Sequence, residues 1–218
     1  MADSSQRMPS LLWVGFTLLL CLLGLAYLLS VAQYDKARQK RLPIIDRIAD
    51  FTLTNQDNQV VTLADLSNRV WVADIIFTRC AGSCPIMSTE MKSLQTALPS
   101  DSQAKLVTLT TDPDYDSPEI LKKYGERYGA DFRRWMFLTG TKAELGRLAA
   151  GSLKLGSTPV PVQGQKSPDD LFVHSTIFVV VDKQARLRGI FQTEGQGVDW
   201  AKVKPKLLAT VKELEGEQ

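Results

Sequence analysis

The chain opens with one long apolar segment, and the rest alternates between short apolar runs and polar connections. Residues 11–32 contain no charged side chain and are rich in leucine. At 1.5 Å per residue, a helix of this length crosses a hydrocarbon core of about 30 Å. The run exceeds the roughly 7–15 apolar residues of a secretory signal, although Ser30-Val31-Ala32 resembles a cleavage site. We therefore predict an uncleaved membrane anchor, with a cleaved signal peptide as the alternative.

The anchor divides the chain into four predicted parts. Residues 1–10 form a short tail, 11–32 the transmembrane anchor, 33–45 a polar and basic linker, and 46–218 one globular domain. More basic residues follow the anchor than precede it, which by the positive-inside rule would keep the domain in the cytoplasm. Long domains translocate largely regardless of such charges, and we expect this one on the far side of the membrane.

The pattern after residue 46 predicts strands and helices in alternation. Strands are expected at residues 70–77, 105–111, 135–138, 175–181 and 186–191, after a hairpin formed by 51–53 and 60–63. Helices are expected at residues 86–98, 118–128, 141–150 and 198–213, with a long loop or hairpin at 156–170. This order is that of a thioredoxin-like α/β fold, in which functional residues collect at strand ends.

Composition narrows the range of possible functions. The net charge is +2, and 26 basic residues are scattered among 24 acidic ones, which gives little support for nucleic-acid binding. Three cysteines do not make a disulfide framework, and Cys21 lies inside the apolar segment. One pair of cysteines and a single histidine therefore remain as the chemically distinctive residues of the domain.

That pair, Cys80 and Cys84, directly follows the apolar run at residues 70–77 and precedes a helix that we expect to start near Pro85. The positive end of a helix lowers a thiol pKa and favours the thiolate, which binds metals and attacks disulfides. A zinc ribbon would need a second cysteine pair, which the chain lacks. The spacing permits either a disulfide or two thiolates on one metal ion.

His174, the only histidine, stands just before a predicted strand. Taken alone, a structural histidine is the ordinary interpretation. In a thioredoxin-like sheet, however, this strand neighbours the cysteine loop. Two thiolates with one imidazole suit copper, as Cu(I) or Cu(II), and zinc could also occupy such a set. Met87 and Met91 recur at helical spacing, and we expect them in the core rather than as copper ligands.

Two aspartates are candidates for roles around the thiols. Asp74 interrupts an otherwise apolar strand, where a buried carboxylate is costly without a partner or a role. It is either a proton acceptor near the thiols or a carboxylate bonded to backbone or an arginine. Asp112 ends the next strand and could face the cysteine loop, where it would either support a metal ligand from behind or tune thiol protonation. Asp116 and Ser117 are expected to be turn and cap residues.

Four motifs in order resemble those of the Sco (SenC-type) family: residues 77–85 (FTRCAGSCP), 111–118 (TDPDYDSP), 135–140 (WMFLTG) and 173–175 (VHS). The resemblance spans residues 48 to the C-terminus. It implies a membrane-anchored, thioredoxin-fold copper protein that helps to assemble the copper A site of cytochrome c oxidase. Carried over to this chain, the family's copper ligands are Cys80, Cys84 and His174, with Asp112 placed close to them.

The resemblance also implies partners and a location. The expected partner is the copper A subunit of the oxidase, besides other copper chaperones or thioredoxin-like reductants. Mitochondrial members carry a transit segment, whereas the short N-terminus here is typical of a bacterial inner-membrane protein facing the periplasm. The segment between the cysteines, Ala81-Gly82-Ser83, lacks the acidic residue that many relatives carry.

Three other functions stay open. A thiol–disulfide oxidoreductase would use Cys80 and Cys84 as a redox pair without His174. A peroxiredoxin-like peroxidase is disfavoured because Thr78 stands two residues before Cys80 rather than three. A membrane-anchored interaction module without chemistry would leave the thiols unexplained.

Overall fold

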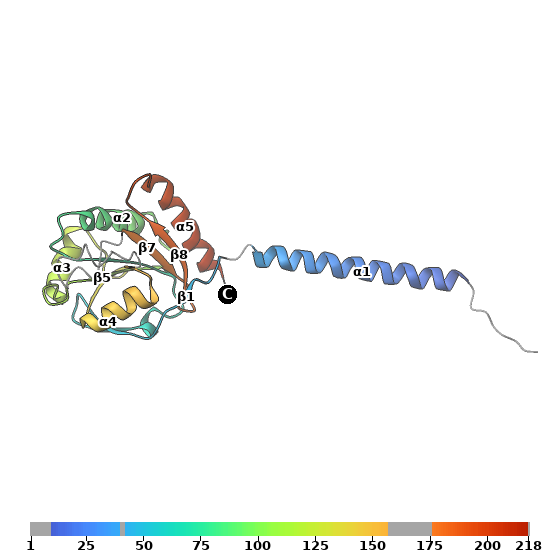
Figure 1. The fold of residues 1–218 in the computed structure, drawn as a ribbon, viewed down its shortest axis with the longest axis horizontal. Coiled ribbons are helices and arrows are strands. Elements are labelled where there is room, and N and C mark those ends of the chain that lie inside the picture. Colours follow the sequence, from blue (N-terminus) through green and yellow to red (C-terminus); the bar gives the residue numbers. More distant parts are fainter. Residues whose placement is uncertain (1–9, 40–41, 157–175, 218) are drawn as a thin grey trace, which may run out of the picture. The chain divides into compact units, whose positions relative to one another are not determined.

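In the computed structural model of the chain, the N-terminal segment and the α/β domain are separate compact units, divided after Leu42. The structure describes residues 10–39, 42–156 and 176–217. In the first unit, α1 runs without a break over Ser10–Gln39 (Figure 1). Within it, Trp13–Ser30 is long and apolar enough to cross a membrane, a property that anchors and signal sequences share. The helix also continues through the first part of the predicted linker.

The second unit is built on an eight-stranded sheet in the order β1-β8-β7-β4-β5-β6-β2-β3. Its strands are β1 Asp46–Arg47, β2 Thr52–Asn55, β3 Val60–Thr62, β4 Trp71–Ile76, β5 Lys105–Thr110, β6 Trp135–Thr139, β7 Ile177–Val181 and β8 Arg186–Gln192. Its helices are η1 Leu63–Leu66, α2 Ser83–Ala97, α3 Pro118–Arg127, α4 Lys142–Gly146, η2 Arg147–Ser152 and α5 Trp200–Gly216. The predicted thioredoxin-like alternation of strands and helices is confirmed.

Strands β4, β5 and β6 are parallel and form the centre of the sheet, and antiparallel strands flank them on both sides. All six residues of β4 are buried, as expected of a strand covered on both faces. Because β4, β5 and β6 point the same way, their carboxyl ends meet at one edge. The cysteine loop follows β4 at this edge, and the loop that carries Asp112 follows β5.

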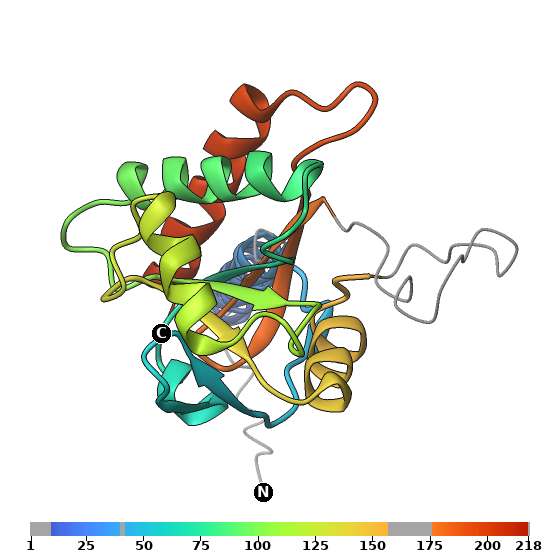
Figure 2. The same cartoon turned by 90° about the vertical axis from the view of Figure 1, so that its left-hand side faces the viewer.

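Two helical layers cover the sheet. Alternate residues of β4 face opposite ways: Trp71, Ala73 and Ile75 pack in the hydrophobic core that includes Leu145 and Leu148 of α4 and η2. Figure 2 shows α4 on one side of the sheet and α2 with α5 on the other.

On the α2 side, a hydroxyl pair joins two neighbouring helices. The Ser88 hydroxyl of α2 and the Tyr124 hydroxyl of α3 lie 2.8 Å apart. Phe178 of β7 meets Trp200 of α5 edge-to-face, with 5.5 Å between the ring centroids. Asp74, which alternates with Ala73 and Ile75, therefore faces the layer formed by α2, α3 and α5.

Helix α2 differs from α3, α4 and α5 in how its N-terminus is capped. Ser117 caps α3 by accepting from the Ile120 N–H at 3.4 Å, as predicted, and Thr141 caps α4 in the same way. Asp199 caps α5. By contrast, α2 has Gly82 at its N-cap and no side-chain cap. Since the first N–H groups of a helix have no intrahelical partner, α2 begins with donors available to another acceptor.

Some elements differ from the predictions. The helix after Thr141 is α-helical only to Gly146 and then widens into the π-helical turn η2. The short elements β1 and η1 were not predicted. The predicted loop at 156–170 lies outside the described residues except for Gly156, as do His174 and residues 1–9.

Candidate metal centre

The cysteine loop connects the end of β4 to the start of α2. The Cys80 N–H donates to the Phe77 carbonyl at 3.1 Å, which closes a turn directly after the strand. The Gly82 N–H then donates to the Cys80 sulfur at 3.4 Å. No side-chain oxygen caps α2, and the Cys80 sulfur is the acceptor at its start. A helix N-terminus holding a sulfur favours its anionic form.

The two thiols differ in burial. Cys80 is partly exposed in the loop, whereas Cys84 lies in the first turn of α2 and is buried, with 5% of its surface exposed. Both are free thiols. The helix begins at Ser83, slightly earlier than predicted, and this places Cys84 inside it.

Their acidity differs accordingly. Burial opposes ionisation of Cys80, but the backbone N–H and thiol of Cys84 and the N–H groups of Gly82 and Ser83 lower the pKa of Cys80 overall. Burial raises the pKa of Cys84 to about 12, and the neighbouring Cys80 and Asp74 add to that rise. One thiol of the pair is therefore readily ionised and the other is held neutral.

Asp116 holds the cysteine loop to the end of β5. It is fully buried, and its carboxylate accepts from the Thr78 hydroxyl, from the Thr78 N–H at 3.2 Å and from the Thr110 hydroxyl at 2.5 Å. Thr78 lies two residues before Cys80, and Thr110 is the last residue of β5. This Asp116 latch (Thr78, Thr110 and Asp116) fixes the two loops at the strand ends relative to each other.

A second, more exposed link joins the same loops. The Arg79 guanidinium pairs with Asp112 at 2.5 Å and stacks over the Tyr115 ring at 4.0 Å. The structure thus places Asp112 beside the cysteine loop, with Arg79, the residue before Cys80, as its partner. The Arg79 side chain is 57% exposed, so this link lies at the rim of the site.

Asp74 lies beneath the site and is completely buried. No arginine partner of Asp74 is found among the described residues, and the Thr108 hydroxyl and the Asp74 backbone N–H lie near its carboxylate without forming a well-aligned hydrogen bond. Burial raises the pKa of Asp74 to about 7, against the opposing effect of the Thr108 hydroxyl. A buried carboxyl that titrates near neutrality is well suited to exchange a proton with its surroundings.

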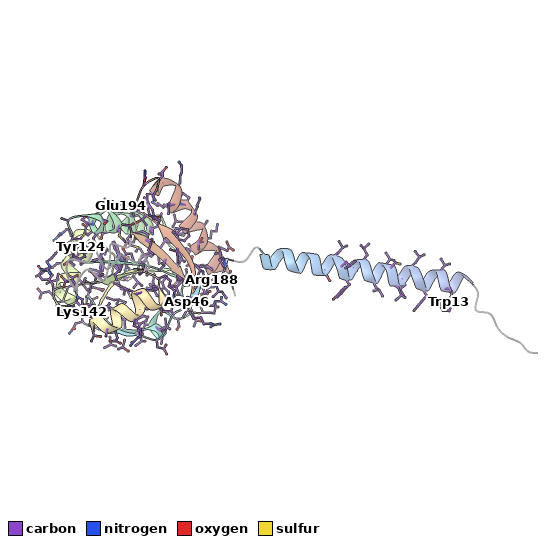
Figure 3. All side chains as sticks on the ribbon, viewed as in Figure 1. Trp13, Asp46, Tyr124, Lys142, Arg188 and Glu194 are labelled. Atoms are coloured by element: carbon purple, nitrogen blue, oxygen red, sulfur yellow. The ribbon has the colours of Figure 1, made fainter. Side chains whose placement is uncertain are left out.

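Two further acidic residues extend from Asp74 along the underside of α2. Glu90 of α2 is buried, and burial raises its pKa to about 7. Glu194, which is labelled in Figure 3, follows β8, and its charge adds to the rise in the pKa of Glu90. Each has one buried oxygen without a hydrogen-bond partner among the described residues.

The residues that sequence reasoning identified are brought together in part. Cys80 and Cys84 are neighbours at the end of β4, Asp74 is near enough to raise the pKa of Cys84, and Asp112 pairs with Arg79 beside the loop. His174 lies outside the described residues. Within the described ranges, no group of three histidine, cysteine or acidic side chains could hold a metal ion. Two adjacent free thiols, one readily ionised, do fit a soft ion such as Cu(I).

Sequence reasoning missed the role of Asp116, which was expected to be a turn residue, and did not identify Glu90. Asp116 lies in the loop after β5, and no local signal marks its role, because its partner Thr78 is 38 positions earlier. Glu90 is the one charged residue among the buried residues of α2, which include Met87, Met91 and Leu94. The two methionines are in the core, as predicted.

Comparisons with known proteins agree with this architecture. The SCO1/SenC family model matches residues 42–208. A SCO1 protein homolog of Bacillus subtilis is 31% identical over 152 residues, covering 69% of this chain and 76% of the relative. A Stutzerimonas stutzeri protein, whose name proposes copper binding, is 31% identical over 179 residues, covering 81% of this chain and 84% of the relative.

A solved structure shows the same relationship. BsSco, described as a member of the Sco family of cytochrome c oxidase assembly proteins with a disulfide switch, aligns with a TM-score of 0.66 and 27% identity. The alignment covers 83% of this chain and 99% of BsSco. Fold, family model and sequence relatives therefore agree, and the chain belongs to the SCO1/SenC family.

Proposed function

We propose that this protein is a membrane-anchored copper chaperone that delivers copper to, or prepares, the copper A site of cytochrome c oxidase. Copper is the cargo, held by the thiolates of Cys80 and Cys84 and the imidazole of His174. The observation that carries the proposal is the thiol pair at the uncapped start of α2. Family membership, the copper-binding name of one relative and the oxidase-assembly description of BsSco support it.

The two thiols have different roles in ligand exchange. Cys80 is partly exposed and readily ionised, so it is the ligand that first meets an incoming or departing ion. Cys84 must lose a proton before it can bind, and its buried position resists that loss. Asp74 is the proposed acceptor of this proton. Asp112 holds Arg79 at the rim of the site, which keeps the loop in place around Cys80.

The proposed domain plan places the chemistry outside the cytoplasm. Residues 11–32 anchor the protein in a bacterial inner membrane, 33–45 link the anchor to the domain, and 46–218 lie in the periplasm. The apolar Trp13–Ser30 segment of α1 supports the anchor. The proposed partners are the copper A subunit of the oxidase and either copper donors or thioredoxin-like reductants.

Copper titration of the full chain, purified anaerobically in detergent, tests the proposal. We expect one copper per chain, no tight binding after Cys80→Ser or Cys84→Ser, and a much larger loss of Cu(II) than of Cu(I) affinity after His174→Ala. Cys21→Ser, in α1, is the matched control and should bind copper like the wild type. Failure to bind copper in competition with a copper-buffering chelator would refute the proposal.

A thiol–disulfide oxidoreductase that reduces the acceptor's cysteines is the second candidate. The contrast between the lowered pKa of Cys80 and the raised pKa of Cys84 favours it, because such a pair has one attacking and one resolving thiol. Complementation of an oxidase-assembly mutant separates the two functions. Full rescue by His174→Ala together with failure of Cys80→Ser would favour the redox role over copper delivery.

A further inference from the structure

The strand starts form a cationic pocket at the edge of the sheet opposite the cysteines. Arg69 precedes β4, Lys105 begins β5, and Arg133 and Arg134 precede β6. They line a cavity of about 290 Å³, in which Asp131 is the one acidic residue among the described residues of its wall. Since β4, β5 and β6 are parallel, these starts necessarily meet at one edge.

Most of this positive charge is not neutralised. Asp131 is engaged by Arg133 at 2.9 Å. The Arg134 guanidinium donates only to backbone carbonyls, among them those of Pro99 at 3.1 Å and Ser102 at 3.3 Å. Lys105 donates to the Arg133 carbonyl. Arg69 has no hydrogen bond or ion pair among the described residues.

The cations also act on one another. Burial lowers the pKa of Lys105, and the nearby charges of Arg69 and Arg134 lower it further. A lysine whose charge is disfavoured by its neighbours is stabilised when an anion enters among them. Arginine and lysine together bind phosphate well, because the planar guanidinium donates two parallel hydrogen bonds to its oxygens.

A larger cavity of about 740 Å³ adjoins this pocket and shares Arg69, Ser102 and Gln103 with it. Apolar side chains line part of it: Val70 before β4, Leu98 after α2, and Leu208 and Val211 of α5. The carboxylate of Glu215, also in its wall, is already engaged by the Ser102 hydroxyl at 2.9 Å and by two backbone N–H groups. A cationic pocket beside a partly apolar cavity suits an amphiphile with an anionic head.

We propose that this end of the domain binds an anionic phospholipid, with its phosphate among Arg69, Lys105 and Arg134 and its glycerol and first acyl carbons along the adjoining cavity. An α1 segment of bilayer length would keep the domain among such headgroups. The inference is independent of copper binding, because its residues lie at the sheet edge opposite Cys80. Inorganic phosphate shares the head chemistry but cannot use the apolar cavity.

Calorimetric titration of the full chain in a non-ionic detergent tests the site. The probes are dihexanoyl phosphatidylglycerol, dihexanoyl phosphatidylcholine and inorganic phosphate. We expect one phosphatidylglycerol per chain, bound at least about tenfold more tightly than either other probe. Arg69→Gln and Lys105→Gln should each weaken it about tenfold, the effect of losing one charge-assisted hydrogen bond.

Matched controls remove the same charges elsewhere. Arg127→Gln on α3 and Lys206→Gln on α5 change exposed residues and should bind like the wild type. Equal affinity for the two lipids, or equal effects of Arg69→Gln and Arg127→Gln, would overturn the site. Phosphate binding as tight as phosphatidylglycerol binding would overturn the lipid assignment. An unchanged unfolding midpoint shows that Arg69→Gln is folded.

Discussion

At the residue scale, two cysteines four positions apart have opposite properties because one lies before a helix and the other within it. The Cys80 sulfur accepts from the Gly82 N–H at the start of α2 and remains partly exposed. Cys84 is buried in the first turn. The same residue type thus has a lowered pKa and an accessible sulfur at one position, and a raised pKa and a buried sulfur at the other.

Alkylation should reveal this difference directly. Treated with iodoacetamide at pH 7–8, the full chain should be modified at Cys80 more than tenfold faster than at Cys84, since each pKa unit changes the thiolate fraction about tenfold. Peptide mass spectrometry distinguishes both from Cys21. In 8 M urea the rates should converge. Equal rates in the native chain would contradict the assigned acidities.

Asp74 should make stability depend on pH. Its pKa, raised from 3.8 to about 7 by burial, means that the folded chain keeps a proton that the unfolded chain loses. The free energy of unfolding therefore falls as pH rises from about 4 to about 7, by up to about 4 kcal/mol from this group. Asp74→Asn should remove that loss, and thus be more stable than the wild type at pH 8.

Urea unfolding of both proteins at pH 4.5 and pH 8 checks the sign. Glu90, whose pKa is also raised, and the Cys84 thiol face the same region and remain in both proteins, so the difference between the two pH dependences reports Asp74 together with its coupling to these two groups. If the free energy of unfolding changes with pH equally in the wild type and in Asp74→Asn, then Asp74 is not held protonated in the folded state.

Sequence reasoning identified which residues are chemically unusual, but not which partners they would have. Cys80, Cys84 and Asp74 stood out because each is a rare or costly type in its context. Asp116 did not, because an aspartate before Ser-Pro is common in turns. Its function depends on Thr78, 38 positions earlier, and no local pattern encodes a contact over that separation.

At the element scale, the Asp116 latch couples the cysteine loop to β5. Buried hydroxyl and N–H donors converge on one carboxylate, so the loop after β4 cannot shift without breaking bonds to the loop after β5. The latch is internal, whereas the Arg79–Asp112 pair beside it is exposed at the rim and screened by solvent.

Asp116→Ala should therefore loosen the site as well as the fold. We expect a loss of about 2–4 kcal/mol in the free energy of unfolding, because the Thr78 donors and the Thr110 hydroxyl lose their acceptor. Cys80 alkylation should slow toward that of an ordinary thiol. Asp114→Ala is the control, since Asp114 is 75% exposed and pairs with Lys142 on the surface. A Cys80 rate unchanged by Asp116→Ala would mean that the loop holds its shape alone.

The elements themselves were largely predictable. Long apolar runs and capped helices follow from periodicity and from residues such as Ser117 and Thr141. The two-residue strand β1 has no periodicity to detect and exists only because β8 offers it an edge. The π-helical turn η2 likewise places Leu148 and Ala149 in the core, a packing requirement that local sequence does not encode.

At the scale of the whole molecule, one buried arginine joins the first and last parts of the domain. Arg188 of β8 donates to Asp182 in the β7–β8 turn at 2.7 Å, to Glu217 after α5 at 2.8 Å and to the Pro43 carbonyl at 3.2 Å. Only 3% of the arginine is exposed. The point where the chain enters the domain is thereby tied to the C-terminal helix.

Arg188→Leu should destabilise the domain by about 2–4 kcal/mol, because Glu217 and the Pro43 carbonyl lose their buried donor and Asp182 keeps only Arg186 as a charged partner. Arg133→Leu is the control, since its pair with Asp131 is made by a 91% exposed side chain and should leave stability unchanged. Thermal unfolding measured without added lipid compares the two. Similar losses of stability in both variants would show that the burial of Arg188 contributes nothing to stability.

The Asp116 latch also has a consequence for the order of events during synthesis. Thr78 and both cysteines leave the ribosome before β5 and Asp116, so the newly made chain carries two thiols in an unstructured loop. Until β5 pairs with β4, the core that buries Cys84 is incomplete, and an oxidant or metal ion would meet both loop thiols exposed. The difference in burial and acidity between Cys80 and Cys84 is thus acquired late, and only in a chain whose sheet is complete.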